Sequence, residues 1–454
     1  MLKRPEPGRF RLEALEEPRA LVGGRWRRHA RGVQREAFFR CEIAIVRIKA
    51  RAHLLRRARR PLDLGGQRVE IEIGRGRKSR RTYGFDDVAL VPGALTLDPE
   101  DVDLSCDLAS VHLDLPMLAS AMDAVVDPRS AATLSRLGGL GVLHLQGLQC
   151  RYEDPIPVYE RIVSAKAEDA IGVIQEAYRE EVKDELIRRR VAELRALGAK
   201  VAVSPTPAFA AHAAEVIGKG LIDVLIVAST VTTARHLSSR YQSPDFKRLR
   251  DLVEAPVFVG NCVSYDAAIE LMRAGADAIL VGVGPGAACT TRRVLGVGVP
   301  QVTAGVDCAA ARDDYERESG KRVPIVLDGG MRVGGDIAKA IAVGADAVMI
   351  GSPLAAAEEA PGRGYHWGMA TSDIGLPRGT RIQVGIAGPM KQILLGPAKR
   401  DDGTLNLFGA LRLSMATCGA RTLREMQKTE IVVAPALAFE GKSQQRAQGV
   451  GGTK

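Results

Sequence analysis

SYDAAIELMRAGADAILVGVG (264–284) and GGDIAKAIAVGADAVMIGS (334–352) are the two stretches that decide the fold of this 454-residue chain. Each has the pattern of a capped helix, a Gly-Ala-Asp turn and a short apolar strand that ends in small residues. Two near-duplicates indicate a repeated helix–strand unit. Because a helix returns the chain before each strand, we expect consecutive strands of such units to run parallel.

Eight short apolar runs match the strand of this unit, and helical patterns separate them. They occupy residues 116–120, 141–145, 200–204, 223–229, 256–261, 278–284, 325–330 and 347–352. Apolar strands that alternate with helices indicate a parallel sheet covered on both faces, and eight such units predict an α/β fold, the (β/α)8 TIM barrel. The alternative is a six-stranded Rossmann sheet, whose G-x-G-x-x-A pattern GVGPGA (282–287) satisfies. We interpret that match as chance, because it follows the sixth strand and contains Pro285.

The composition restricts the class of protein. Apolar residues make up 46% of the chain, which suffices for a large core. The sequence has no apolar run of about 18 residues, the length that crosses a membrane. The seven cysteines are scattered, odd in number and form no C-x-x-C pair. This pattern argues against a disulfide framework or a zinc knuckle and predicts a reducing, cytoplasmic location.

The net charge of +10 is concentrated at the start of the chain. Residues 1–68 contain 19 Lys and Arg against 7 Asp and Glu, whereas residues 69–454 contain 45 against 47. We therefore predict a basic, disordered N-terminal extension (1–68) and a barrel domain (69–454). The extension could instead be a nucleic-acid-binding arm, a targeting peptide that lacks the usual apolar core, or sequence translated from a start codon assigned too early.

A barrel of this kind places function at the C-terminal ends of its strands and in the loops that follow. Met122 and Asp123 follow the first strand, Asn261 ends the fifth, and a Gly-Pro-Gly loop follows the sixth. Glycines also follow strands seven and eight, where backbone N–H groups commonly hold a phosphate in this fold. A phosphorylated small molecule is therefore the expected ligand.

Cys289 is the predicted nucleophile. It lies in a glycine-rich loop just past a strand end, whereas a structural cysteine usually lies inside an apolar run, as Cys262 and Cys308 could. Thr291 and Arg292 follow closely, and a nearby cation favours the reactive thiolate over the thiol.

Carboxylates near the same loops have two interpretations each. Asp328 closes an apolar strand before two glycines, so it either caps the loop or accepts hydrogen bonds from a ribose diol. Glu358 and Glu359 either form a solvated helix end, or one of them serves as a proton relay with Thr291.

These residues lie in motifs that resemble the IMP dehydrogenase/GMP reductase family. The resemblance runs in order from about residue 69 to the end, and the Gly-Pro-Gly…Cys-Thr-Thr-Arg loop is its most specific part. The motifs are TYGFDDVALVP (82–92), MDAVVDP (122–128), LGGLGVLH (137–144), FVGNCVS (258–264), GVGPGAACTTRRVLGVGVPQVTA (282–304), LDGGMRVGGDIAKAIAVGADAVMIGS (327–352) and EEAPG (358–362).

The resemblance implies a role for each site residue. Cys289 would attack carbon 2 of the purine of a nucleoside 5′-monophosphate, and a nicotinamide cofactor, NAD or NADP, would accept or donate a hydride. Thr291 with Glu359 would relay protons, and Asp328 would hold the ribose. The other residues would bind the phosphate (Gly330, Gly351, Ser352), the rest of the substrate (Met122, Gly368, Met369), the cofactor (Ser229, Asn261) and a potassium ion through carbonyl groups (Gly284, Gly286, Cys289).

The sequence departs from the family pattern in three places. The stretch 145–200 is too short for the tandem CBS regulatory module that IMP dehydrogenases usually insert, and it has a helical pattern. Ala228 stands where the family usually has a cofactor-binding Asp. The segment 366–389 is shorter than the dehydrogenase flap and lacks its Arg-Tyr pair, for which Arg378 and Arg381 are weak substitutes.

With these departures the chain most resembles the bacterial IMP dehydrogenase-related subgroup, and three functions stay open. GVGVPQ and EEAPG favour oxidation of IMP to XMP. The missing flap arginine removes a base that activates water, which favours a GMP reductase that releases ammonia. Ala228 would suit a purine-nucleotide-binding protein without turnover, but such a protein does not need the intact Cys289 loop. The resemblance also implies a homotetramer.

Overall fold

The structure is a computed structural model, and it describes residues 70–239, 243–368, 380–436 and 440–450. The chain divides into two compact units, Met1–Arg81 and Thr82–Lys454. In the first unit the described residues form an antiparallel hairpin of β1 (Glu70–Gly74) and β2 (Arg77–Arg80). The predicted extension 1–68 lies outside the described residues, so its boundary stays a prediction.

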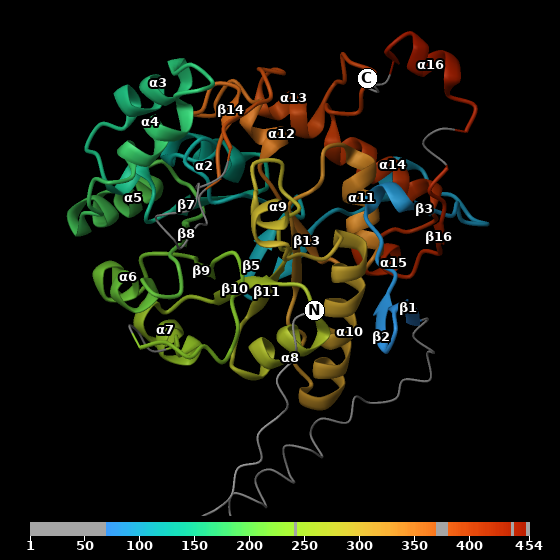
Figure 1. Cartoon of the computed structure of the whole chain (residues 1–454), viewed down its shortest axis with the longest axis horizontal. Helices are drawn as coiled ribbons and strands as arrows, with labels where there is room; N and C mark the ends of the chain where they lie inside the picture. Colours follow the sequence, from blue (N-terminus) through green and yellow to red (C-terminus); the bar gives the residue numbers. More distant parts are fainter. Residues whose placement is uncertain (1–69, 240–242, 369–379, 437–439, 451–454) are drawn as a thin grey trace, which may run out of the picture. The chain divides into compact units, whose positions relative to one another are not determined.

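Eight parallel strands of the second unit close into a barrel, which confirms the predicted fold class (Figure 1). Their order around the barrel follows the chain, and the last strand pairs with the first through Val348 and Met117. The strands are β6 (Met117–Ala119), β7 (Leu140–His144), β8 (Ala202–Ser204), β9 (Val224–Ala228), β10 (Val257–Cys262), β11 (Ala278–Val281), β12 (Ile325–Asp328) and β13 (Ala347–Ile350).

A helix follows most strands and packs on the outside of the barrel. Each of these helices covers strands with a buried apolar face, as the alternating pattern predicts. They are α2 (Pro128–Arg136), α5 (Asp184–Ala196), α6 (Ala210–Ile217), α7 (Phe246–Val253), α8 (Tyr265–Arg273), α10 (Gln301–Ser319) and α11 (Gly334–Ala342). None of the helices in the described part of the chain combines the length and the apolar character that crossing a bilayer requires.

All eight predicted runs contain a barrel strand, but most of them extend past the strand end, and three do so by two residues or more. One of these three is the run 347–352, whose strand ends at Ile350. The run 278–284 stops being a strand at Val281, and the run 325–330 stops at Asp328. Gly329 and Gly330 have φ angles of 81° and 85°, which lie outside the extended region that a strand requires. These glycines turn the chain and form the loop instead.

Side chains that point inward fill the barrel. Phe258, Leu280 and Met349 belong to one buried cluster with apolar residues from the other strands. The hairpin of β4 (Cys106–Leu108) and β5 (Val111–Leu113) joins this cluster at the N-terminal end of the barrel, where Lys200 donates to the carbonyl of His112. The interior is therefore a packed core, and the open space lies at the other end.

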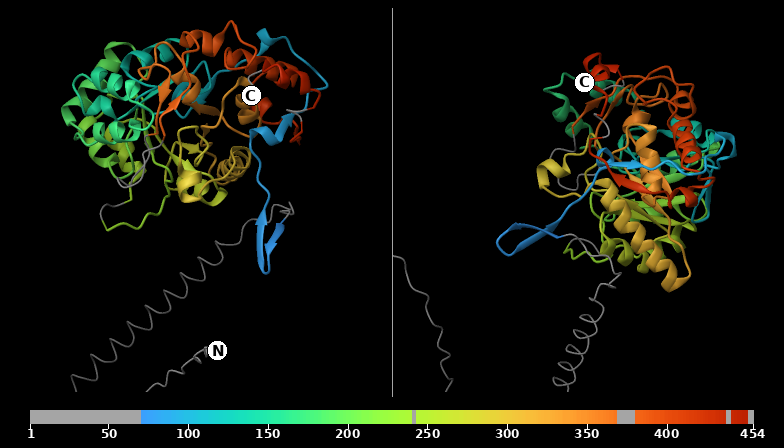
Figure 2. Two further views of the ribbon diagram at one scale, coloured as in Figure 1. Left: turned by 45° about the horizontal axis from the view of Figure 1, so that its top comes forward. Right: turned by 90° about the vertical axis from the view of Figure 1, so that its right-hand side faces the viewer.

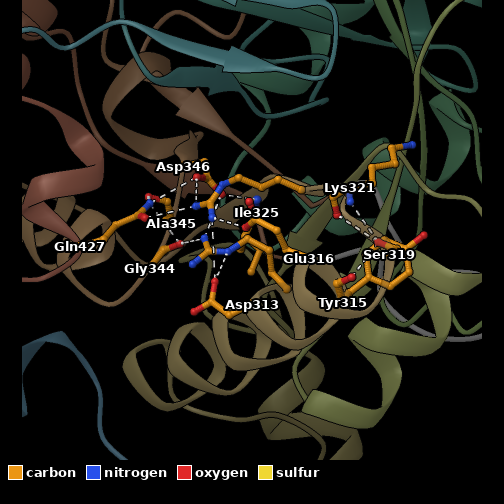
Figure 3. Close-up of polar contacts among 12 residues, drawn as sticks. Asp313, Tyr315, Glu316, Ser319, Lys321, Ile325, Gly344, Ala345, Asp346 and Gln427 are labelled. Carbon is orange, nitrogen blue, oxygen red and sulfur yellow. Dashed lines mark hydrogen bonds and ion pairs between the residues drawn. The ribbon is translucent and has the colours of Figure 1, made fainter.

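A repeated aspartate holds the N-terminal end of the barrel. Asp223, Asp277 and Asp346 each precede a strand, and each accepts a hydrogen bond of 2.7–3.0 Å from a backbone N–H near the start of the preceding strand. Asp346 is also paired with two arginines, Arg312 at 3.1 Å and Arg322 at 2.8 Å (Figure 3). The Gly-Ala-Asp turns of the repeated unit thus link neighbouring strands.

The stretch 145–200 is helical, as its sequence predicts. It forms α3 (Ile156–Ser164) and α4 (Ala170–Ala177) before α5. These two helices contribute to a separate apolar cluster that also contains Trp367. The segment therefore has a core of its own beside the C-terminal end of the barrel.

The C-terminal part of the chain returns to its beginning. The helices α13 (Met390–Leu395), α14 (Leu407–Thr417) and α15 (Leu423–Met426) lead to β16 (Ile431–Val433), and α16 (Ser443–Ala447) follows. β16 pairs in antiparallel fashion with β3 (Val88–Leu90), as Figures 1 and 2 show. Helix α14 packs against α11 on the outside of the barrel.

Candidate functional site

A cavity of about 230 Å³ opens at the C-terminal ends of the barrel strands, and all eight strands or their loops line it. Every predicted site residue except Glu359 and Met369 is part of its lining. Met369 lies outside the described residues. The residues brought together are Met122, Ser229, Asn261, Gly284, Gly286, Cys289, Thr291, Asp328, Gly330, Gly351, Ser352 and Gly368.

Cys289 is exposed in the loop between β11 and the short helix α9 (Thr291–Leu295). Its Sγ lies 3.2 Å from Oγ1 of Thr291, and Thr291 itself is buried. A thiol that reaches solvent and contacts a hydroxyl can lose its proton and attack an electrophile in the cavity. Cys262 and Cys308, by contrast, are buried, as expected for structural cysteines.

Arg292 braces the loop that carries Cys289. Its Nε donates to the carbonyl of Val283 at 3.1 Å, and its Nη2 donates to that of Val299 at 2.7 Å. Burial lowers the pKa of Arg292, and negative charge on Cys289 opposes this effect. The sequence suggested only a cation beside the thiol, whereas the structure shows that this cation also fixes the loop.

Asp328 ends β12 and faces the cavity beside Asn261. The Nδ2 group of Asn261 donates to Oδ2 of Asp328 at 2.7 Å. Burial raises the pKa of Asp328 to about 6, and the bond from Asn261 limits the rise. The second carboxylate oxygen is available to accept a hydrogen bond from a ligand hydroxyl.

Gln301, at the start of α10, was not among the predicted site residues. Its Nε2 group donates to the carbonyls of Asp328 at 2.9 Å and Val281 at 3.2 Å. It therefore joins the ends of β11 and β12 and sets the distance between the Cys289 loop and Asp328. Its place in the quoted motif GVGVPQ was a signal, but its partners are distant in sequence.

The loops after β12 and β13 form the wall where a phosphate is expected. Gly330 and Gly351 line it, and a Cβ at Gly351 would lie 3.1 Å from Sδ of Met122. Oγ of Ser352, the first residue of α12 (Ser352–Ala355), lies 3.0 Å from Nε2 of His366. Small residues thus bring backbone and hydroxyl groups to the cavity surface.

His366 lines the cavity and was not assigned by sequence reasoning. It lies in β14 (Tyr365–His366), which pairs with β15 (Ile382–Gln383), and its side chain is buried. Burial lowers the pKa of His366 to about 4, so the imidazole is neutral at pH 7. The motif HWGM around it contained the signal, because Gly368 two residues later was predicted to bind substrate.

Glu359 lies outside the cavity lining. Its Oε2 accepts a hydrogen bond of 2.8 Å from the backbone N–H of Met390, the first residue of α13. This bond satisfies a backbone N–H at the start of α13, which neither interpretation of these glutamates, a solvated helix end or a proton relay, predicted. The structure does not bring Glu359 into contact with the Cys289–Thr291 pair, and its relay role stays a prediction.

The opposite wall of the cavity, formed by the ends of β8 and β9, is rich in hydroxyl groups. Ser204, Thr206, Ser229 and Thr230 line it together with Ala228. Ser229 donates to the carbonyl of Val231 at 2.8 Å. Neutral hydroxyl groups suit the carboxamide and ribose of a nicotinamide cofactor, so the donor set fits such a group.

The carbonyl groups predicted to bind potassium lie in one loop, 284–289. The carbonyl of Gly286 accepts a hydrogen bond of 3.0 Å from the N–H of Cys289, which leaves one lone pair for a cation. Potassium binding stays a prediction.

Comparisons with known proteins agree with this geometry. The family described as "IMP dehydrogenase / GMP reductase domain" matches residues 82–373. An "Uncharacterized oxidoreductase" of Mycolicibacterium smegmatis is 37% identical over 372 residues, which cover 80% of this chain and 99% of the relative. An "Inosine-5′-monophosphate dehydrogenase" of Methanocaldococcus jannaschii is 30% identical and covers 77% of this chain and 92% of the relative.

A solved structure is similar as well. The crystal structure of an IMP dehydrogenase/GMP reductase-like protein from Corynebacterium glutamicum has a TM-score of 0.76 and 35% sequence identity, covering 82% of this chain and all of that one. The fold and the site therefore define an oxidoreductase of the TIM-barrel class. This chain belongs to the IMP dehydrogenase/GMP reductase family.

Proposed function

We propose that the protein oxidises IMP to XMP with a nicotinamide cofactor through a covalent bond to Cys289. The observation that carries this proposal is the exposed thiol of Cys289 in the cavity, 3.2 Å from the Thr291 hydroxyl. Asp328 and Asn261 line the same cavity, so a nucleoside held by its ribose would present its base to the loop. The name of the archaeal relative supports the same reaction.

The proposed chemistry begins with attack of the Cys289 thiolate on carbon 2 of the purine, which forms an S–C bond. Thr291 lies where it can take up and pass on the thiol proton. Ser229 and Thr230 line the wall that would hold the nicotinamide, which when bound would accept the hydride released as the C–H bond at carbon 2 breaks. Water then replaces sulfur at carbon 2, the S–C bond breaks, and Cys289 is released with XMP.

GMP reductase is the second candidate, and a specific observation favours it. Arg381, one of the two flap arginines, donates to the carbonyls of Ile162 and Val163 and lies over the ring of Tyr365 at 4.9 Å. This guanidinium is engaged away from the cavity lining and does not activate water there. In the reductase direction the thiol would displace the 2-amino group of GMP as ammonia, and a hydride from the reduced cofactor would then replace sulfur at carbon 2, so no water has to be activated. A nucleotide-binding protein without turnover is the third candidate.

The cofactor is NAD or NADP, and potassium, a homotetramer and a cytoplasmic location belong to the same proposal. One pair of assays separates the candidates. Purified protein is incubated with IMP and NAD or NADP, and with GMP and NADPH, in buffers that contain potassium or lithium. Formation of reduced cofactor from IMP supports the dehydrogenase, and consumption with GMP supports the reductase. No change in the amount of reduced cofactor in either assay, with nucleotide binding retained, supports a nucleotide-binding protein without turnover.

Replacing Cys289 with Ala tests the covalent mechanism. We expect Cys289→Ala to lower kcat by at least about a thousandfold, because no other group forms the bond to carbon 2. The matched control is Cys418→Ala, which removes a half-buried thiol at the end of α14, outside the cavity lining. Full turnover of the Cys289 variant would rule out covalent catalysis.

A further inference from the structure

Three buried side chains form a hydrogen-bonded chain behind the cavity. The indole Nε1 of Trp367 donates to the Tyr178 hydroxyl at 3.0 Å, and that hydroxyl donates to Oδ2 of Asp123 at 2.5 Å. The direction is unambiguous, because an indole N–H only donates. The Tyr178 oxygen therefore accepts from Trp367 and has its own proton left for the carboxylate.

The chain is well shielded from water. Asp123 is 1% exposed, and Trp367 is fully buried. Oδ2 of Asp123 also accepts from the N–H of Leu148 at 2.8 Å. A Cβ at Gly147 would lie 2.1 Å from Oδ1 of Asp123, so this glycine is required for the close approach of the carboxylate. Polar groups at such depth are costly to leave unpaired.

Each end of the chain adjoins a residue of the cavity wall. Met122 precedes Asp123 in the loop after β6, and His366 and Gly368 flank Trp367. All three line the cavity. The middle member, Tyr178, follows α4 in the helical segment 145–200, which stands where family members carry a regulatory module. This segment thus connects two cavity walls that are distant in sequence.

We propose that Tyr178 is a positioning residue, which holds Met122 and the strand around His366 at the spacing that a purine nucleotide requires. The purine nucleotide as ligand rests on the proposed function. The link that Tyr178 makes between the two cavity walls does not. Without the Tyr178 hydroxyl, the indole N–H of Trp367 loses its acceptor, and Oδ2 of Asp123 loses one of its donors. The two walls then keep the backbone hydrogen bond of 3.0 Å from the N–H of Gly362 to the carbonyl of Ala124 and their apolar packing, but they lose the side-chain link that fixes Trp367 against Asp123.

The test compares Tyr178→Phe with Tyr159→Phe. Tyr159 is an equally buried tyrosine of the same apolar cluster, with its ring centroid 6.3 Å from that of Trp367. Its hydroxyl accepts from Gln149 at 2.9 Å and is not part of the chain. Both variants remove one buried hydroxyl, but Tyr178→Phe breaks two hydrogen bonds, one of them to a carboxylate, so its thermal stability should fall further than that of Tyr159→Phe.

We expect Tyr178→Phe to raise the KM or Kd for the purine nucleotide about tenfold, while the KM for the cofactor changes less than twofold. Tyr159→Phe should leave the nucleotide KM within twofold of the parent protein. Equal nucleotide KM values for the two variants, or equal changes for nucleotide and cofactor, would overturn the positioning role.

Amide hydrogen exchange provides a readout that does not depend on activity. We expect Tyr178→Phe, but not Tyr159→Phe, to speed exchange in peptides covering 122–126 and 364–368. If this change occurs and the protein binds neither IMP nor GMP, the proposed function fails while the positioning role stands. If exchange is the same in both variants, the positioning role is wrong whatever the substrate.

Discussion

Burial shifts the pKa values of the ionisable residues in and behind the cavity more than charged neighbours do. Burial raises the pKa of Asp328 to about 6 and that of Asp123 to about 6, and it lowers the pKa of His366 to about 4. Near neutral pH the carboxylates are mostly ionised and the imidazole is neutral. The cavity therefore accepts hydrogen bonds at Asp328 and carries no positive charge on His366.

Asp328 predicts a pH dependence of stability. Its pKa is raised in the folded state, so its stabilising contribution is complete below pH 3.8 and is lost as the pH rises through about 6. We expect the free energy of unfolding of the parent protein, relative to Asp328→Asn, to fall by about 2–3 kcal/mol between pH 4 and pH 7. Urea titrations of both proteins at several pH values measure this difference. A difference that does not vary with pH would contradict the raised pKa.

The sequence identified residues whose local pattern is distinctive, such as Cys289 in its glycine-rich loop and Asp328 at a strand end. It did not identify Gln301, His366 or Tyr178. Their partners lie 27, 14 and 55 residues away along the chain, so only the closed barrel brings these groups together. Glu359 shows the opposite case, because its local sequence fits two roles, a solvated helix end or a proton relay, and the structure gives it a different contact, a hydrogen bond from the first N–H of α13.

At the scale of elements, the repeated Gly-Ala-Asp turn explains how the strands keep their spacing. Burial opposes ionisation of Asp346, but Arg312 and Arg322 outweigh it and hold the pKa of this carboxyl below its ordinary value. The Nε2 group of Gln427, beyond α15, donates to the carbonyl of Ala345 at 2.9 Å beside it (Figure 3). The carboxylate thus connects strands β12 and β13 to the helices outside.

Asp346→Ala should lower the free energy of unfolding by about 3–5 kcal/mol, because it leaves the buried Arg312 without its partner in the barrel. The control is Asp313→Ala, which removes the exposed carboxylate that also pairs with Arg312 and should cost less than about 1 kcal/mol. Since the pKa of Asp346 is lowered by folding, its contribution is present above the unfolded value and disappears as the pH falls. Equal losses in the two variants would contradict this account.

Strands and helices were predictable because their periodicity is local, and all eight runs contain a strand. The ends of β11, β12 and β13 were not, because apolar or small residues continue past the last residue of each strand. The sequence also predicted helices between 145 and 200. It could not show that they build a core with Trp367, which is distant along the chain.

In the molecule as a whole, the excess positive charge and the predicted site residues lie in different parts of the chain. The +12 charge of residues 1–68 lies outside the family match, which begins at residue 82. The global basicity therefore gives no information about the ligand of the barrel. Backbone and hydroxyl groups of the cavity wall suit a phosphate instead.

Removal of residues 1–68 should leave kcat/KM within twofold of the full chain, since every predicted site residue lies in the barrel unit. The full chain is the control in the same assay. Both proteins are also applied to immobilised nucleic acid at low salt. Retention of the full chain alone would favour the nucleic-acid-binding arm, and loss of turnover would show that the extension serves the enzyme.

The pairing of the last barrel strand with the first has a consequence for synthesis on the ribosome. β6 can pair with β13 only after residue 350 has been synthesised, and β3 can pair with β16 only after residue 433 has been synthesised. Until then a nascent chain exposes an unpaired strand edge, on which other chains can add. The barrel therefore closes only after its last strand, which ends at residue 350 of 454, has been synthesised.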